Sequence, residues 1–253
     1  MGITQGLAEF LPVSSSGHLV LLQNLMGLSG EMLYFDILMH AATLLAVVIV
    51  FRKDILWLIT HPLSKDSLLL VMSAIPTVII AVVFKAFIED SFGGNYLWYG
   101  FLTTAVFLLL TDIFVLRKNR MVIGGKLNQI KTRSAAMMGI AQGLAVLPGV
   151  SRSGATVCTG LVMRENRETA ARFSFLMSIP VIVGSALMGI IDAAKNPGML
   201  AFSALPLIAG FVFAFIFGIL SIKLMLKIIK NRRLWPFVPY LAALSVIAFI
   251  FVK

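Results

Sequence analysis

The sequence has little charge, a single cysteine and no recognisable leader peptide. Only 13% of its 253 residues are charged, whereas 59% are hydrophobic. An average soluble domain has about 25% charged and roughly 45–50% apolar residues. The scarcity of charge therefore argues against a soluble protein and favours a lipid bilayer as the solvent. Cys158, alone, excludes an internal disulfide and a cysteine-based metal cluster. Met1–Phe10 lacks a basic segment and contains Glu9, so no signal peptide is expected.

Long apolar runs take the place of charge along the chain. A helix that crosses the hydrocarbon core needs about 20 mainly apolar residues. Six runs meet this condition approximately, at 35–51, 68–88, 96–116, 173–191, 199–222 and 234–252. Four shorter apolar pieces form two pairs, at about 1–28 and 134–163, each joined by a turn rich in Pro, Ser and Gly. Because such short pieces are more often re-entrant than spanning, the sequence predicts an all-α polytopic membrane protein with six transmembrane helices and two re-entrant helix pairs.

The chain also contains an internal repeat. Residues 5–17 align without gaps on residues 142–154, at a constant offset of 137 and with eight of 13 positions identical. We therefore expect a single membrane domain, 1–253, whose first repeat is 1–116 and whose second is 134–253, each with one re-entrant pair and three spans. Because three crossings is an odd number, the repeats should enter the bilayer from opposite sides. Inverted repeats of this kind bind their ligand near the midplane, where broken helices of both halves meet.

The net charge of +10 has a topological explanation. In the six-span arrangement, 17 of the 21 Lys and Arg residues fall on one face of the membrane, as is typical of cytoplasmic loops. These residues lie in the stretches 52–65, 117–133, 164–172 and 223–233. Nucleic-acid binding is therefore not expected. Arg152, in the second turn, is the one basic residue that neither a loop nor a span end explains.

Polar side chains gather in the two turns, at the depth of the membrane. They are Gln5, Glu9, Ser14, Ser15, Ser16 and His18 in the first turn, and Gln142, Ser151, Arg152, Ser153 and Thr156 in the second. An ionised Arg at the bilayer centre costs about 2.5–3.5 kcal/mol on insertion scales. Tight helix connections alone would not explain such a charge. A structural ion pair of Glu9 with Arg152 is the alternative to a functional role.

The surroundings of Arg152 suit an anion. Val-Ser-Arg-Ser-Gly precedes a helical run, so its backbone N–H groups and the helix N-terminus favour negative charge. The guanidinium fork matches phosphate oxygens, and Ser-Ser-Ser-Gly at 14–17 repeats the arrangement. Two facing anion sites fit a diphosphate. The predicted phosphate-binding residues are Ser14, Ser151, Arg152, Ser153 and Thr156. Ser16 and Ser153 are also expected to cap helices.

Glu9, Ser15 and His18 offer groups that hydrolysis needs, and with Arg152 they are the predicted catalytic residues. A carboxylate can hold a divalent metal or accept a proton. Glu9, assisted by Gln5, is accordingly the candidate metal ligand or base. A histidine can carry protons or act as a nucleophile. The choice between Ser15 and His18 stays open, and His18 is equally compatible with a purely structural role.

Three further polar residues lie within predicted spans. Asp36 and His40 are four residues apart and share a helix face. We expect them to line the cavity or to bond to each other, in a supporting role. Asp112 is expected to form a local ion pair with Arg117.

Over the motifs Gln5-Gly-Leu-Ala-Glu-Phe-Leu-Pro-Val-Ser-Ser-Ser-Gly-His18 and Pro148-Gly-Val-Ser-Arg-Ser-Gly-Ala-Thr156, the sequence closely resembles the undecaprenyl-diphosphatase family associated with bacitracin resistance. The resemblance extends over essentially the whole chain. It implies a membrane phosphatase, a hydrolase that converts undecaprenyl diphosphate into undecaprenyl phosphate and inorganic phosphate. This reaction recycles the carrier lipid for peptidoglycan synthesis and cell wall biogenesis, and confers antibiotic resistance. The resemblance also implies a divalent cation, Mg or Ca, and the inner membrane of a bacterial cell.

Individual positions follow the same resemblance. Ser15, His18, Ser151, Arg152 and Thr156 match the serine, histidine, arginine and threonine of the two family motifs. The first position of the glutamate-containing motif, Glu in some members, is Gln5 here. A transporter or flippase of a polyprenyl phosphate lipid is the alternative function, because inverted repeats with broken helices typify carriers. A homodimer is compatible with the sequence.

Overall fold

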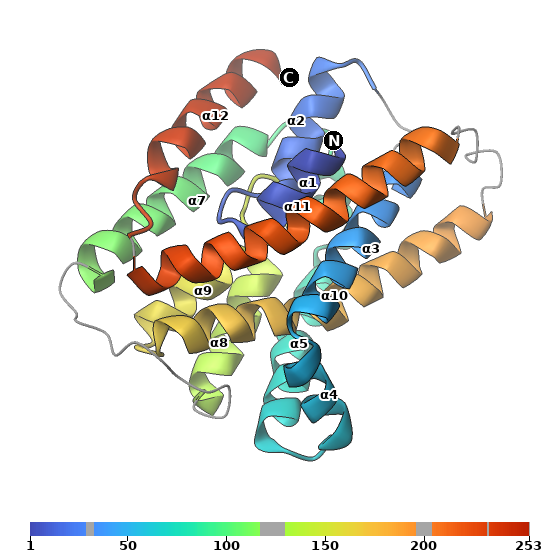
Figure 1. Cartoon of the computed structure of the whole chain (residues 1–253). Helices are drawn as coiled ribbons and strands as arrows, with labels where there is room; N and C mark the ends of the chain where they lie inside the picture. Colours follow the sequence, from blue (N-terminus) through green and yellow to red (C-terminus); the bar gives the residue numbers. More distant parts are fainter. Residues whose placement is uncertain (29–32, 117–129, 196–203, 232, 253) are drawn as a thin grey trace.

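The computed structural model describes residues 1–28, 33–116, 130–195, 204–231 and 233–252, and throughout these ranges the regular structure is helical (Figure 1). The predicted all-α fold class is thus confirmed. Parts of two predicted basic stretches, 117–129 and 232, and the start of the predicted span at 199–203 lie outside the described residues.

Within the described residues, the predicted apolar segments coincide with helices, although the predicted span 68–88 is divided into two helices at Phe84. The first half of the chain forms α1 (Gly2–Phe10), α2 (Ser15–Leu25), α3 (Leu33–Val50), α4 (Arg52–Thr60), α5 (Lys65–Val83), α6 (Lys85–Ser91) and α7 (Leu97–Thr111), and a π-helical turn (Asp112–Leu116) extends α7. The second half forms α8 (Thr132–Leu144), α9 (Arg152–Val162), α10 (Arg167–Lys195), α11 (Ala204–Asn231) and α12 (Phe237–Phe251). The short pairs α1–α2 and α8–α9 occupy the two segments that were predicted to be re-entrant.

Among the residues that the structure describes, four segments are long and apolar enough to cross a membrane. They are Lys65–Val83, Leu97–Val115, Arg167–Met188 and Ala204–Lys230. Two shorter apolar helices, Phe35–Val50 and Phe237–Phe251, correspond to the remaining predicted spans. The outward faces of the long helices carry exposed apolar side chains such as Val82 and Ile216, which suit a hydrocarbon environment. The chain is therefore a polytopic membrane protein, with four of the six predicted spans at full spanning length.

The short helix α4 lies where a loop was expected. It has no buried residues and exposes Leu56, Trp57 and Ile59. Its nine residues are too few, and its first turn too charged, to resemble a span. An ion pair of Asp54 with Arg172, 3.3 Å long, ties it to α10.

Asp112 was expected to pair with Arg117, but in the described structure its ion-pair partner is Arg233. Arg233 donates to the Asp112 carboxylate from Nη2 at 2.6 Å, and the Leu234 N–H donates to it at 2.9 Å. Arg117 lies outside the described residues. Asp112 therefore joins the end of α7 to the chain that leads into α12.

The two halves exchange packing partners. α1 packs against α11, as Figure 1 shows, and its counterpart α8 packs against α5. A Cβ atom on Gly2 would collide with Gly210, and one on Gly139 would collide with Ser73. Both members of this second pair lie 137 residues from those of the first. Small residues let helix backbones approach closely in membranes. The repeat thus extends into the packing of the second span, whereas the inverted orientation of the halves stays a prediction.

Candidate active site

The turns between α1 and α2 and between α8 and α9 lie against each other. Ser153 Oγ donates to the Leu11 carbonyl at 2.9 Å, which ties the second turn to the first. A Cβ atom on Gly17 would collide with Gly149. Gly149 itself has a φ of 86°, a left-handed conformation that favours glycine. The contact unites the polar groups of both halves in one region, as the repeat predicted.

Ser14 and Ser151 are the N-caps of α2 and α9. Ser14 Oγ accepts a hydrogen bond from the Gly17 N–H at 3.2 Å, and Ser151 Oγ accepts one from the Gly154 N–H at 3.0 Å. Such caps satisfy backbone donors that the first turn of a helix leaves unpaired.

The prediction that Ser16 and Ser153 cap these helices was wrong by two residues. Both lie inside the first turn, because the helices begin at Ser15 and Arg152. Ser15 and Arg152 are equivalent positions of the repeat. Each occupies the N-terminal position of its helix, where the backbone dipoles favour negative charge.

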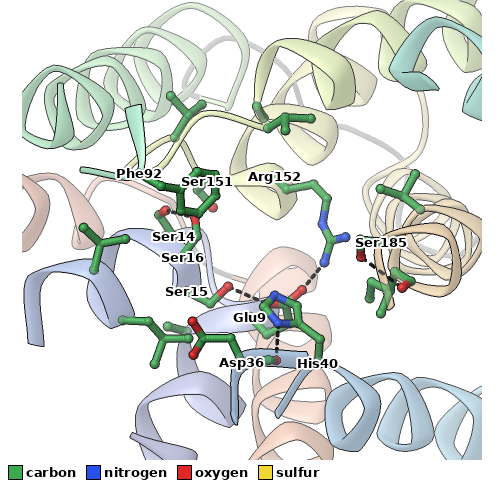
Figure 2. A pocket seen from close by; sticks show the side chains of 18 of the residues that line it. Glu9, Ser14, Ser15, Ser16, Asp36, His40, Phe92, Ser151, Arg152 and Ser185 are labelled. Atoms are coloured by element: carbon green, nitrogen blue, oxygen red, sulfur yellow. Dashed lines mark hydrogen bonds and ion pairs between the residues drawn. The ribbon is translucent and has the colours of Figure 1, made fainter. Parts of the chain in front are cut away.

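Glu9 is the centre of the polar cluster, and its side chain is only 2% exposed. Arg152 donates from Nη2 to Oε1 of Glu9, which forms an ion pair between the two halves. Ser15 Oγ donates to Oε2, and Gln5 Nε2 donates to the same oxygen at 3.0 Å. His40 Nε2 lies 4.0 Å from that oxygen. Figure 2 shows Ser15, Arg152 and His40 converging on Glu9. The buried carboxylate is thus balanced by the arginine that the charge distribution had singled out.

A cavity of about 400 Å³ opens beside this cluster, within the range typical of ligand sites. Its polar lining comprises Glu9, Ser14, Ser15, Ser16, Gln23, Asp36, His40, Gln142, Ser151, Arg152 and Ser185. Its apolar lining includes Leu19, Val20, Phe92, Val146, Val181 and Ile182. A ligand that fits both kinds of lining has a charged head and an apolar body.

Asp36 and His40 line the cavity, as one of the two sequence alternatives predicted. They also bond to each other, but through the backbone carbonyl of Asp36 and not through its carboxylate. His40 Nδ1 bonds to the Asp36 backbone carbonyl at 2.7 Å, and the Asp36 carboxylate accepts from Gln23 Nε2 at 3.0 Å. Because a carbonyl only accepts, Nδ1 of His40 carries the proton and Nε2 faces Glu9. Gln23 was missed, because a single amide within an apolar helical run has no local signal.

Four predicted site residues do not line the cavity within the described structure. They are Gln5, His18, Ser153 and Thr156. Thr156 Oγ1 bonds to Ser174 Oγ at 2.5 Å, which joins α9 to α10. His18 bonds to the Ser14 carbonyl and to the Tyr240 hydroxyl, both at 2.6 Å. In this arrangement these residues support the groups that face the cavity.

The oxygen atoms around Glu9 fit a shared role in holding a divalent cation. Gln5 Oε1 is buried and has no hydrogen-bond partner among the described residues. No group of three or more His, Cys, Asp or Glu residues in that part of the chain is placed to hold a metal. Mg²⁺ is often bound through one or two carboxylates together with substrate phosphates. Glu9, which lines the cavity, therefore fits a cation that completes its coordination with a bound phosphate, and the buried Gln5 oxygen is a further candidate ligand behind it.

The chain is similar to known proteins over nearly its whole length. Residues 1–247 match the family described as Bacitracin resistance protein BacA. The Undecaprenyl-diphosphatase of Carboxydothermus hydrogenoformans is 41% identical over 250 residues, which cover 97% of this chain and 93% of that protein. Undecaprenyl-diphosphatase 4 of Bacillus cereus is 38% identical over 248 residues, with 98% and 93% covered. The Undecaprenyl-diphosphatase of Methanosphaera stadtmanae is 39% identical over 274 residues, with 99% and 95% covered. This chain therefore belongs to the bacitracin resistance protein BacA family.

Proposed function

We propose that this protein is an undecaprenyl-diphosphate phosphatase, a membrane hydrolase that releases inorganic phosphate and leaves undecaprenyl phosphate. The observation that carries this function is the cluster of Glu9, Ser15 and Arg152 in the wall of an amphipathic cavity. A diphosphate head requires cationic and N–H donors, and an isoprenoid tail requires apolar walls. Both are present in one cavity of a membrane protein whose relatives carry this enzyme name.

The N-termini of α2 and α9 supply the anion site. Ser15 and Arg152 begin these helices and line the same cavity, so the positive ends of two helix dipoles and the guanidinium lie at one site. The guanidinium pairs with Glu9. A bound phosphate would contact the Arg152 guanidinium together with Glu9. The ion pair with Glu9 orients the guanidinium so that it can donate to two phosphate oxygens.

The geometry favours Ser15 over His18 as the nucleophile. The Ser15 hydroxyl donates to Glu9, and both residues line the cavity, so the carboxylate can accept the hydroxyl proton. Both ring nitrogens of His18 are engaged by other groups.

The reaction then has two steps. Ser15 Oγ attacks the terminal phosphorus, its proton passes to Glu9, and a new Oγ–P bond forms. The bond from this phosphorus to the bridging oxygen breaks, and its electron pair leaves with undecaprenyl phosphate. Glu9 then releases its proton to water. A water molecule attacks the same phosphorus while Glu9 accepts one of its protons, the Oγ–P bond breaks, Glu9 passes this proton to Ser15 Oγ, and inorganic phosphate is released. Arg152 stabilises the negative charge of the phosphoryl oxygens in both steps.

A divalent cation, Mg or Ca, belongs to the proposal. Glu9 and the unpaired oxygen of Gln5 would hold it. When bound, the cation neutralises part of the diphosphate charge. The proposed cellular place is the inner membrane of a bacterium, where carrier recycling serves peptidoglycan synthesis and counters bacitracin. A homodimer stays a prediction.

Two neighbouring serines provide the test. Ser15 and Ser16 line the same cavity, but Ser15 donates to Glu9 and Ser16 does not. In purified protein, Ser15→Ala should lower phosphate release from undecaprenyl diphosphate by at least about a thousandfold, because the nucleophile is lost. Ser16→Ala should stay within about threefold of wild type. Wild-type protein that releases no phosphate would contradict the function, and an active Ser15→Ala would contradict the nucleophile.

The interrupted helix pairs α1–α2 and α8–α9, one in each half, keep a lipid flippase as the second candidate, because carriers often bind their ligand at interrupted helices of two repeats. Proteoliposomes that hold fluorescent undecaprenyl phosphate in one leaflet distinguish the two functions. A phosphatase should release phosphate from the diphosphate form without moving the monophosphate. Lipid movement without phosphate release would favour the flippase.

A further inference from the structure

His18 lies behind the first turn, away from the cavity. It belongs to α2, and its ring contacts α7 and α12. The ring is nearly parallel to that of Tyr240, 5.7 Å away between centroids, and meets Phe101 edge-on at the same distance. The side chain is buried. A histidine so enclosed by aromatic rings and by its own turn is not placed to touch a ligand in the cavity.

The hydrogen bonds of His18 fix which nitrogen carries its proton. The Ser14 carbonyl can only accept, so Nδ1, at 2.6 Å, must be the N–H donor. In the neutral ring Nε2 then has a lone pair, and the Tyr240 hydroxyl, also at 2.6 Å, donates to it. The Tyr240 hydroxyl therefore donates a hydrogen bond to His18, and His18 donates one to the Ser14 carbonyl. Neither nitrogen remains available to carry a proton to a substrate.

Ser14, whose carbonyl accepts the hydrogen bond from His18, has a strained backbone. Ser14 has a φ of 68° and a ψ of 98°, and Arg164 is the only other non-glycine residue in the described ranges with a positive φ. Such a conformation persists only when the surrounding structure enforces it, and it is often found at functional sites. Here it comes directly before Ser15, whose hydroxyl donates to Glu9.

The second turn provides an internal comparison. Ser151, the equivalent of Ser14, has an ordinary φ of −76°. Ala155 stands at the position equivalent to His18, so no imidazole bonds to this turn. The strained serine and the histidine therefore occur together in the first turn, and both are missing from the second.

We propose that Tyr240 and His18 are positioning residues for the reaction, and that they hold the Ser14 backbone so that Ser15 Oγ stays on Glu9. We call the series Tyr240 hydroxyl, His18 ring and Ser14 carbonyl the serine-turn latch. It brings a residue of α12, in the second half, to the catalytic turn of the first half. The latch rests on the proposed function, because its readout is the reactivity of Ser15.

Three single variants, one double variant and one control test the latch by phosphate release from undecaprenyl diphosphate. Tyr240→Phe removes one hydroxyl and should lower kcat about tenfold, with KM within about twofold, because one hydrogen bond to the latch is lost. His18→Asn keeps an amide donor at the place of Nδ1, and Asn24 already makes such a bond to the carbonyl four residues before it. The kcat of His18→Asn should therefore fall about as much as that of Tyr240→Phe. His18→Ala removes both bonds and should fall at least about a hundredfold.

The double variant His18→Asn with Tyr240→Phe should be no slower than either single variant, because the two residues act as one unit. Tyr99→Phe removes a hydroxyl from an exposed tyrosine of α7 and should leave kcat unchanged. Gel filtration in detergent and the thermal midpoint establish that each variant is folded.

Two outcomes would overturn the latch while wild type stays active. One is a Tyr240→Phe variant with wild-type kcat. The other is a folded His18→Asn variant as inactive as His18→Ala, which would make His18 a proton carrier or nucleophile. Absence of phosphate release from wild type would instead overturn the proposed function, and the latch with it.

Discussion

Removal of Arg152 should affect stability and activity through the same ion pair. Glu9 is 2% exposed, and Arg152→Ala would leave it as a buried carboxylate without a counterion. Loss of one partner from a buried pair costs about 3–5 kcal/mol. Ser15 and Gln5 still donate to Glu9, so the lower end, about 3 kcal/mol, is expected. At roughly 2–4 °C per kcal/mol for a chain of this size, the unfolding midpoint should fall by about 10 °C.

A second substitution separates stability from catalysis. Glu9→Gln, added to Arg152→Ala, removes the unbalanced charge, so the unfolding midpoint should rise most of the way back to its wild-type value. Phosphate release should stay at background in both variants, because the anion site has no guanidinium. Arg172→Ala is the matched control, because its ion pairs with Asp54 and Glu168 are partly exposed and should contribute only about 0–1 kcal/mol.

Thermal unfolding in detergent, followed by tryptophan fluorescence, and colorimetric phosphate release measure the two effects. A wild-type midpoint in Arg152→Ala would show that Glu9 does not depend on this counterion. Activity regained in the double variant would refute Arg152 as the phosphate clamp.

Two further predictions concern the cation and the second turn. Gln5→Glu adds a second carboxylate beside Glu9, so calorimetry without substrate should show about tenfold tighter Mn²⁺ binding; unchanged binding would argue against this cation site. Gly149→Ala places a Cβ atom against the Leu97 carbonyl at a φ of 86°, so the thermal midpoint should fall by at least about 5 °C. Gly184→Ala, at a helical position where nothing lies within 4 Å, should leave the midpoint unchanged or slightly raised, and equal midpoints in the two variants would contradict the steric argument.

Hydropathy predicted the helices well, because apolar runs and the cost of an unpaired backbone in lipid leave few alternatives. The repeat and the unexplained charge of Arg152 predicted which turns meet. The register of the helix caps was missed, since Ser14, Ser15 and Ser16 are chemically alike and local sequence does not show which one begins the helix. α4 was not predicted, because it is too short to span the membrane and its first turn is charged, so hydropathy does not distinguish it from a loop.

Contacts between residues far apart in the sequence were not predicted, for a different reason. Tyr240 lies 222 residues from His18, and Arg233 lies 121 residues from Asp112. Nothing in the spacing or composition of one partner identifies the other. Such pairs arise from the packing of helices around the turns, which a single sequence does not encode in any local pattern.

The exchange of packing partners has a consequence for how the protein is made. α1 leaves the ribosome well before α11, against which it packs, because α11 is completed more than about 200 residues later. At roughly 5–20 residues per second, the wait is on the order of 10–40 s. Glu9 likewise enters the membrane before its arginine is synthesised. A nascent chain that stops at its midpoint therefore holds an unbalanced carboxylate and an uncovered face of small residues, both of which suit recognition by membrane quality-control proteases.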